Sequence, residues 1–238
     1  MSVTVVMTSY WPEGEVGDAR VLYAKQTLEG LLKYLQHEEG LRLHIADDGS
    51  AGNQQVHIRH MLYKASELWE SIASVSDSEH HGIGASLNKA LTALREQDNY
   101  WMYITDDWVL TRELNLDGPI KLMRVYGYDL VRLGPIHPDV TCVSRFSSDI
   151  GWWLDLHQHY GGFAFATRPF VATKDFWAKI GPFDENLNSY ETERLYAERV
   201  AKWPVKLAYW GGVDLAGPWQ HVGDVCVGYK EVEAGIEA

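Results

Sequence analysis

Hydrophobic residues in the first hundred positions form short continuous runs, separated by segments in which they recur at helical spacing. The continuous runs are typical of buried strands and cover 3–10, 41–46, 69–75 and 100–105. The segments with helical spacing cover 18–37, 53–64 and 83–96. This alternation predicts an α/β fold in which a mostly parallel sheet carries helices on both faces.

The regular alternation ends near residue 107. The elements expected beyond it are a proline-stiffened loop at 134–138, a segment rich in aromatic residues and histidine at 152–160, a strand at 161–166, and helices at 174–180 and 190–203. We therefore expect one domain, 1–238, with a first half at 1–110 and a differently organised second half at 111–238.

Composition excludes several classes of protein. Hydrophobic residues make up 46% of the 238 positions, which is enough for a substantial core. No apolar run approaches the ~20 residues that span a bilayer, and the N-terminus lacks the basic region of a signal peptide. Cys142 and Cys226 are far apart and form no CxxC motif. We expect both to be reduced thiols in a cytoplasmic protein without stable membrane insertion.

The formal net charge of −12 argues against binding of a polyanion over a broad face of the protein. It suits a protein that holds cations locally, although an acidic surface also favours solubility. The charge is uneven, since residues 112–179 carry eight Lys or Arg and seven Asp or Glu, a net of +1. A contact with nucleic acid in this segment therefore stays open.

Two of the predicted strands end in adjacent carboxylates, Asp47-Asp48 and Asp106-Asp107. In a parallel sheet the carboxyl ends of the strands meet at one edge, and ligands bind there. Carboxylate oxygens combined with water and phosphate oxygens form a typical site for Mg²⁺ or Mn²⁺. The alternative for each pair is an ordinary exposed turn that ends the strand.

Five motifs, taken in order, resemble those of family 2 glycosyltransferases of the GT-A fold. They are Val5–Tyr10, Asp47-Asp48-Gly49-Ser50, Thr105-Asp106-Asp107, Gly181–Glu185 and Glu191-Thr192-Glu193. The resemblance extends from about residue 3 to about residue 225. It implies a Rossmann-like GT-A sheet flanked by helices, with nucleotide-sugar binding in the first half and an acceptor-side elaboration in the second. It also implies an inverting, metal-dependent sugar transferase.

The resemblance assigns a group of residues to the nucleotide-sugar: Thr8, Ser9, Tyr10, Asp47, Asp48, Asn88 and Asp106. Thr8 and Tyr10 correspond to residues that frame the base, which a tyrosine ring can stack on. Asp48 corresponds to the acid that accepts a hydrogen bond from base or ribose, whereas Asp47 either assists it or packs internally. No clear counterpart exists for a basic residue that some relatives place ahead of the helix at 83–96, so diphosphate binding would fall to metal and backbone amides.

The metal site implied by the resemblance consists of Asp107 and His221. Asp107 is the second acid of a DxD-type motif in which Thr105 stands where many relatives have a third acid. His221 belongs to a C-terminal His-x-Gly, and imidazole suits Mn²⁺ better than Mg²⁺. The cofactor expected from the resemblance is therefore Mn²⁺ or Mg²⁺, although a lone histidine is often structural.

The general base implied by the resemblance is Glu193, six residues before Arg199. Most relatives have Asp in that position, so Glu191 stays open as a rival. Both acids also suit the first turn of a helix, where they favour the macrodipole. The aromatic and histidine side chains at 152–160 are candidates for the acceptor side, although core packing is the more common role and is expected for at least half of them.

The function expected is transfer of a sugar from a nucleotide-diphosphate sugar, with UDP favoured, to an acceptor hydroxyl on a glycan, a small molecule or a modified nucleobase. Three alternatives stay open: a nucleotidyltransferase, a non-catalytic nucleotide-sugar-binding module, and a transferase acting on a modified base in nucleic acid. The first would carry a Gly-rich basic loop after the first strand, which Trp11-Pro12-Glu13-Gly14 does not provide. The charge of −12 argues against tight binding to a nucleic-acid backbone.

Overall fold

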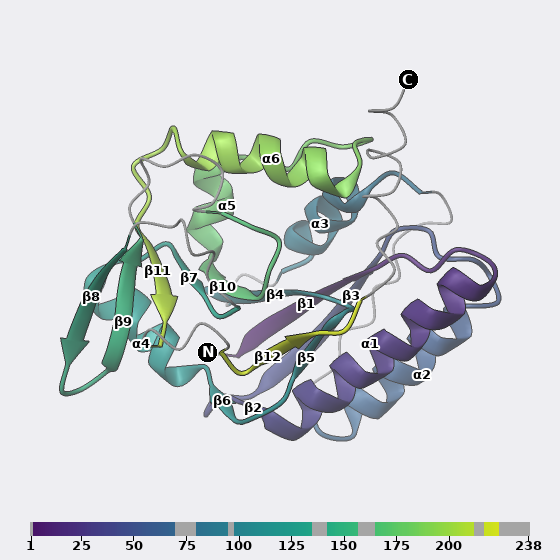
Figure 1. Ribbon diagram of the computed structural model, residues 1–238, viewed down its shortest axis with the longest axis horizontal. Coiled ribbons are helices and arrows are strands. Elements are labelled where there is room, and N and C mark those ends of the chain that lie inside the picture. Colours follow the sequence, from purple (N-terminus) through teal and green to yellow (C-terminus); the bar gives the residue numbers. More distant parts are fainter. Residues whose placement is uncertain are drawn as a thin grey trace.

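A large twisted sheet lies at the centre of the computed structural model (Figure 1). The structure describes residues 2–69, 80–94, 98–134, 142–156, 165–211 and 217–223. Within them, eight strands form the sheet in the order β3-β1-β4-β10-β7-β11-β9-β8. Their bounds are β1 Val3–Ser9, β3 Leu41–Asp47, β4 Tyr100–Thr105, β7 Leu130–Arg132, β8 Cys142–Ser147, β9 Gly151–Leu156, β10 Phe170–Thr173 and β11 Leu207–Trp210. Cys142 carries a free thiol, and Cys226 lies outside the described residues.

The predicted parallel core is present in the first half of the chain. β1 pairs in parallel with β3 on one side and with β4 on the other. The registers Ser9↔Asp47 and Thr8↔Thr105 bring the three strand ends to the same edge of the sheet. Every residue of β1 and β3 is buried, as expected of parallel strands covered on both faces. Residues 70–79, which include most of the strand expected at 69–75, lie outside the described part of the chain.

The sheet is mixed, however, and not mostly parallel as the sequence predicted. β10 is antiparallel to both β4 and β7, and β8, β9 and β11 follow one another in antiparallel pairs. Among the described strands of this sheet, β7 and β11 form one further parallel pair. The physical reason is the connection between strands, because β8 and β9 form a hairpin with a short turn, whereas parallel neighbours need a long crossover. The strand expected at 161–166 falls largely on residues outside the described part.

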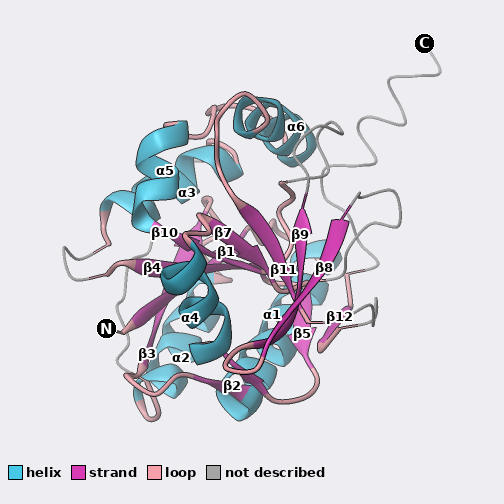
Figure 2. Cartoon of the chain, turned by 90° about the vertical axis from the view of Figure 1, so that its left-hand side faces the viewer, coloured by secondary structure: helices cyan, strands magenta, loops and turns pink. Residues whose placement is uncertain are grey.

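Helices cover both faces of the sheet (Figure 2). One face carries α1 Glu15–Tyr34, α2 Gln55–Ser66 and α4 Asp117–Tyr126, and the other carries α3 Ile83–Thr92, α5 Lys174–Ile180 and α6 Ser189–Val200. Two short pairs lie beside the sheet: β2 Leu35–Gln36 with β6 Leu114–Asn115, and β5 Trp108–Leu110 with β12 Trp219–His221. None of the helices in the described residues is both long and apolar enough to cross a membrane.

The two helical layers bury separate hydrophobic cores on the two faces of the sheet. In the first, α1 contributes Val21, Leu28 and Leu31, whose spacing places them on one helical face. In the second, aromatic residues dominate, and the rings of Phe183 and Tyr196 stack at a centroid distance of 3.8 Å. α6 is thereby fixed against the loop that precedes it.

Helix α3 packs so closely on that loop that only glycine fits at its second position. A Cβ on Gly84 would lie 2.1 Å from the carbonyl oxygen of Asp184. Gly84→Ala is expected to destabilise the protein by about 1–3 kcal/mol, because backbone must move to relieve the overlap. Gly52→Ala is the matched control, since a Cβ there meets nothing within 4 Å. Urea unfolding of the two variants checks this, and equal midpoints would contradict the packing described.

Candidate functional site

A cavity of about 820 Å³ lies at the carboxyl ends of the parallel strands. Eight of the residues predicted for the site line it: Thr8, Ser9, Tyr10, Asp48, Asp106, Asp107, Glu193 and His221. They come from β1, β3, β4, α6 and β12, so chain segments more than two hundred residues apart meet there. Asp47, Asn88 and Glu191, which were also predicted, do not line it.

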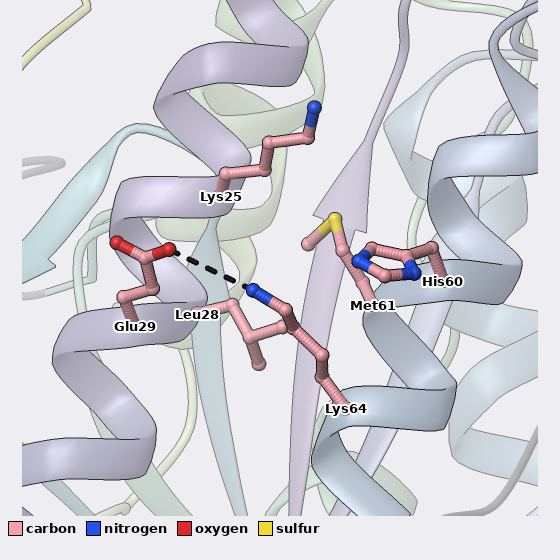
Figure 3. A pocket seen from close by; sticks show the side chains of 6 residues that line it. All are labelled: Lys25, Leu28, Glu29, His60, Met61 and Lys64. Atoms are coloured by element: carbon pink, nitrogen blue, oxygen red, sulfur yellow. Dashed lines mark ion pairs between the residues drawn. The ribbon is translucent and has the colours of Figure 1, made fainter.

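A second, smaller pocket of about 200 Å³ lies between α1 and α2 and contains none of the predicted residues. Figure 3 shows its side chains, with Lys64 and Glu29 facing one another across it at an N–O distance of 3.9 Å. The cavity at the strand ends is therefore the candidate functional site.

Tyr10 and Asp48 form one end of the cavity together with His80, which the sequence did not single out. The rings of Tyr10 and His80 stack with centroids 4.1 Å apart and planes 21° apart. His80 Nδ1 lies 2.8 Å from Asp48 Oδ2. The other carboxylate oxygen, Oδ1, accepts hydrogen bonds from the backbone N–H of His81 at 3.1 Å and the hydroxyl of Ser86 at 3.3 Å. This end of the cavity thus combines an aromatic face with a carboxylate acceptor.

Asp47 packs internally in this structure, which is one of the two alternatives that the sequence left open for it. Its carboxylate is fully buried and accepts hydrogen bonds from Ser9 Oγ at 3.1 Å, from Ser50 N at 3.0 Å and from Ser50 Oγ. Burial raises the pKa of Asp47 above its ordinary value. These contacts join the ends of β1 and β3 and fix the turn at 48–50, because a strand alternates its side chains and sends Asp47 inward.

Asn88 is also structural, so its assignment to the nucleotide is not supported. Its side-chain amide donates to Phe183 O at 3.0 Å and to Glu185 Oε1 at 2.9 Å, and its carbonyl accepts from Phe183 N at 2.8 Å. Asn88 therefore ties α3 to the loop before α6.

Asp106 is held inside the protein beneath the cavity. It has no exposed surface, and its carboxylate accepts a hydrogen bond from Trp11 Nε1 at 2.7 Å and forms an ion pair with Arg20. Burial raises the pKa of Asp106 to about 6, and the Arg20 guanidinium offsets part of this effect. Direct contact of Asp106 with a ribose, as expected from the resemblance, does not fit these contacts without rearrangement.

Arg20 brings a basic side chain to the cavity near Asp106, and the sequence did not predict it. It lines the cavity from α1, and its Nε is buried without a hydrogen-bond partner. The sequence contains no local sign of this contact, because Arg20 lies on a helix 86 residues before Asp106. Arg20 can therefore present positive charge to an anionic ligand while Asp106 fixes its side chain.

Asp107 and His221 lie side by side at the edge of the cavity. The pairing of β5 with β12 sets His221 opposite Trp108, and Asp107 Oδ2 is 3.4 Å from His221 Nε2. Thr105 donates to Asp107 Oδ1 at 2.6 Å. Burial alone would raise the pKa of Asp107, but the hydrogen bonds from His221 and Thr105 outweigh it and lower the pKa below its ordinary value. The side chain is therefore a ready anionic ligand.

The pair fits neighbouring positions around a divalent cation. Ligands at right angles with bonds near 2.1 Å are roughly 3 Å apart, close to the separation of Asp107 and His221. The described residues contain no cluster of three or more His, Cys, Asp or Glu side chains suited to a metal. Within the described part of the chain, Asp107 and His221 are thus the two side chains that would act as ligands, and substrate or water could complete the coordination. Gly223 packs directly on the pair, since a Cβ there would lie 2.8 Å from Asp107 Oδ2.

Glu193 faces the cavity from α6, whereas Glu191 does not. Glu193 Oε2 accepts hydrogen bonds from Thr167 N at 2.8 Å and from Thr167 Oγ1. Glu191 instead contacts the N-cap residue Asn188, whose Oδ1 accepts from Glu191 N at 2.8 Å and whose side-chain amide donates to Glu191 Oε2 at 3.1 Å. Glu191 is therefore occupied in starting the helix.

Two arginines accompany Glu193, and neither was predicted. Arg168 lines the cavity next to Thr167 in the chain. Arg132 ends β7 and is buried, and its pKa is lowered to about 10 by burial and by the charge of Arg168, against the opposing effect of Glu193. The two arginines therefore place an excess of positive charge around the Glu193 carboxylate.

The aromatic residues proposed for the acceptor side give no support to that role. Trp152 is 56% exposed on β9, Trp153 is buried against Tyr126, and neither lines the cavity. The remaining candidates, His157, His159 and Tyr160, lie outside the described residues.

The comparisons with known proteins identify the fold. No protein family model matches the sequence, and curated protein sequences give no significant match. The structure is similar to TarS 1–349 of S. aureus, with a TM-score of 0.63 and 13% identity over 92% of this chain and 60% of that one. It is similar to the mannosyltransferase PcManGT of Pyrobaculum calidifontis, with a TM-score of 0.57 and 14% identity over 90% and 55%. It is similar to GalNAc-T7, with a TM-score of 0.59 and 10% identity over 93% and 44%.

These three proteins are GT-A glycosyltransferases, and the chain has their fold, which confirms the fold class expected from the sequence. The chain spans 60%, 55% and 44% of their respective lengths. At identities of 10–14% the likeness concerns the arrangement of the chain and does not extend to individual side chains.

Proposed function

We propose that this protein is a metal-dependent glycosyltransferase that moves a sugar from a nucleotide-diphosphate sugar to an acceptor hydroxyl. The observation that carries the proposal is the convergence of three groups in one cavity: Tyr10 with Asp48, Asp107 with His221, and Glu193. A base-binding end, a metal-binding edge and a carboxylate base are the parts that such a transfer requires. The shared GT-A fold supports the same function.

The donor nucleotide is expected to bind with its base on Tyr10 and its diphosphate near Asp107 and Arg20. Similar structures contain UDP-GlcNAc in TarS and GDP-Man in PcManGT. A carboxylate such as Asp48 only accepts hydrogen bonds, so a base has to present an N–H to it. Uracil and guanine carry such a group on the ring, whereas the donor of cytosine is its exocyclic amino group. UDP is the donor nucleotide that we favour.

Asp107 and His221 would hold Mn²⁺ or Mg²⁺ against the diphosphate. PcManGT and GalNAc-T7 are both complexed with Mn²⁺. A bound divalent cation supplies charge stabilisation to a departing diphosphate. Thr105 orients the Asp107 carboxylate, and Arg20, fixed by Asp106, adds positive charge at the same end.

Glu193 would remove the proton from the acceptor hydroxyl, which then attacks the anomeric carbon opposite the diphosphate. Thr167 holds Glu193 Oε2 through two hydrogen bonds and leaves Oε1 available for the acceptor. A single displacement of this kind inverts the anomeric configuration. NMR of the product anomer tests this point.

A thermal-shift panel tests the donor site. UDP with Mn²⁺ is expected to raise the melting temperature of the protein, since a ligand that binds only the folded state stabilises it. CDP with Mn²⁺ is expected to give a smaller shift, because cytosine has a lone pair at the ring position where uracil carries its N–H and offers Asp48 only its exocyclic amino group. EDTA is expected to abolish most of the UDP shift. If no nucleoside diphosphate shifts the melting temperature with any divalent metal, the proposed function is wrong.

A further inference from the structure

We infer that His80 occupies the nucleobase position on Tyr10 in the free protein, lowers its affinity for nucleotides, and has to leave that position when a nucleotide binds. The inference rests on the proposed function, because it concerns the base-binding end of the same cavity. No counterpart of this role was apparent in the sequence, where His80 stands in a polar segment before the helix at 83–96.

The stacking distance shows that His80 and a base compete for the same face of Tyr10. The two ring centroids are 4.1 Å apart with nearly parallel planes, so the rings are in van der Waals contact. A base inserted between them would require a separation of roughly 7 Å, twice the contact distance of carbon atoms. A base that stacks on this face of Tyr10 therefore displaces the imidazole.

The polar contacts of His80 also match those expected of a base. Asp48 Oδ1 is already used by His81 N and Ser86 Oγ, which leaves Oδ2 as the acceptor for a ligand. His80 Nδ1 lies 2.8 Å from that oxygen and 3.2 Å from the Asp48 carbonyl oxygen. His80 thus presents an aromatic face to Tyr10 and a ring nitrogen to Asp48, as a pyrimidine with a ring N–H would do.

The surroundings of His80 favour displacement by rotation of the side chain. The imidazole is 53% exposed, so it can turn outward into solvent. The next residue is anchored on both sides, since His81 N donates to Asp48 and His81 O accepts from Asn186 N at 2.9 Å. Gly82 lies against Leu187, since a Cβ added to Gly82 would be 2.5 Å from the carbonyl oxygen of Leu187. The backbone after His80 is therefore fixed while its side chain has room to move.

The consequence is an energetic cost of opening the donor site, which every nucleotide meets when it binds. A base that both stacks on Tyr10 and donates to Asp48 replaces the two contacts that His80 loses. Because those contacts belong to the free protein, their loss costs UDP and CDP the same amount. Removal of His80 should therefore tighten the binding of both nucleotides by the same factor and leave the ratio of their affinities unchanged.

Isothermal titration calorimetry of the full chain with UDP, CDP and pyrophosphate, each with Mn²⁺, tests this inference. The proteins compared are wild type, His80→Ala, His80→Phe and the control His60→Ala, which changes an exposed histidine of α2 beside the smaller pocket. We expect His80→Ala to bind UDP about tenfold more tightly, the equivalent of one hydrogen bond to a charged group. His80→Phe should gain less, because its ring still competes for Tyr10. Pyrophosphate, which has no base, should bind all four proteins equally.

Each other result decides against the inference in a different way. Equal or weaker UDP binding by His80→Ala would overturn it, since His80 would then be a bystander or a direct contact of the nucleotide. Tighter binding of pyrophosphate by the same variant would also overturn it, because the effect would not concern the base. Absence of UDP binding by wild type and His80→Ala alike would refute the proposed function itself, and the inference with it.

Discussion

Glu193→Gln is expected to reduce the rate of sugar transfer by about 10²–10⁴-fold while leaving the affinity for nucleoside diphosphate unchanged. The amide retains the size of the side chain and the acceptor for Thr167, but it cannot take a proton from the acceptor hydroxyl. The measurement is the turnover of UDP-sugar with a saturating acceptor, together with calorimetric titration of UDP. A large loss of turnover with unchanged UDP affinity identifies a group that acts in the chemical step.

Glu191→Gln provides the matched control two residues away on the same helix. Glutamine retains a side-chain oxygen that accepts from the Asn188 amide and leaves the N-cap hydrogen bond unchanged, so both stability and turnover should stay close to those of wild type. If Glu191→Gln lost turnover and Glu193→Gln kept it, the assignment of the general base would be reversed.

Asp107→Asn is expected to remove the metal-dependent part of nucleotide binding and to lower turnover by at least about 100-fold, because charge stabilisation by a bound metal contributes several kcal/mol. The low pKa of Asp107 means that the carboxylate is charged near neutral pH, and the neutral amide is a poor ligand for Mn²⁺ or Mg²⁺. The thermal shift caused by UDP with Mn²⁺, compared with the shift in EDTA, is the measurement.

Asp149→Asn is the control for this change, since it removes one exposed carboxylate from the turn between β8 and β9. It should leave the metal-dependent shift intact. His221→Ala should weaken the shift less than Asp107→Asn, because water can replace a neutral imidazole more readily than a charged ligand. A full metal-dependent shift in Asp107→Asn would exclude this residue as the metal ligand.

The sequence correctly predicted the edge of the sheet at which the cavity lies, but it did not show which of the strand-end carboxylates face the cavity and which are buried. Asp47 and Asp48 are adjacent, yet one is buried among hydroxyls and the other lines the cavity. In the same way, Asp106 forms an internal ion pair with Arg20, whereas Asp107 contacts His221. Neighbouring residues at a strand end point in opposite directions, and the direction follows from the packing around them.

The residues that the sequence missed share one property. Arg20, Thr167 and Arg168 reach the cavity from elements whose position depends on tertiary contacts. His80 likewise lacks a motif of its own, and its stacking on Tyr10 spans 70 positions. A single arginine on a helix or histidine in a loop has no local pattern that separates it from an ordinary surface residue.

The sequence by itself determined the α/β class, the parallel first half and the carboxylates at the strand ends, because these follow from local periodicity and from where each run of apolar residues stops. The antiparallel pairing of β10 with β4 and β7, and of β11 with β9, was visible only in the tertiary structure, because it joins strands that are distant in the sequence. Only the tertiary structure places Glu193, and not Glu191, at the cavity, since the two residues lie on nearly opposite sides of a helix with 3.6 residues per turn. Which of the two faces the cavity depends on how α6 is rotated, and the stacking of Tyr196 on Phe183 helps to fix that rotation.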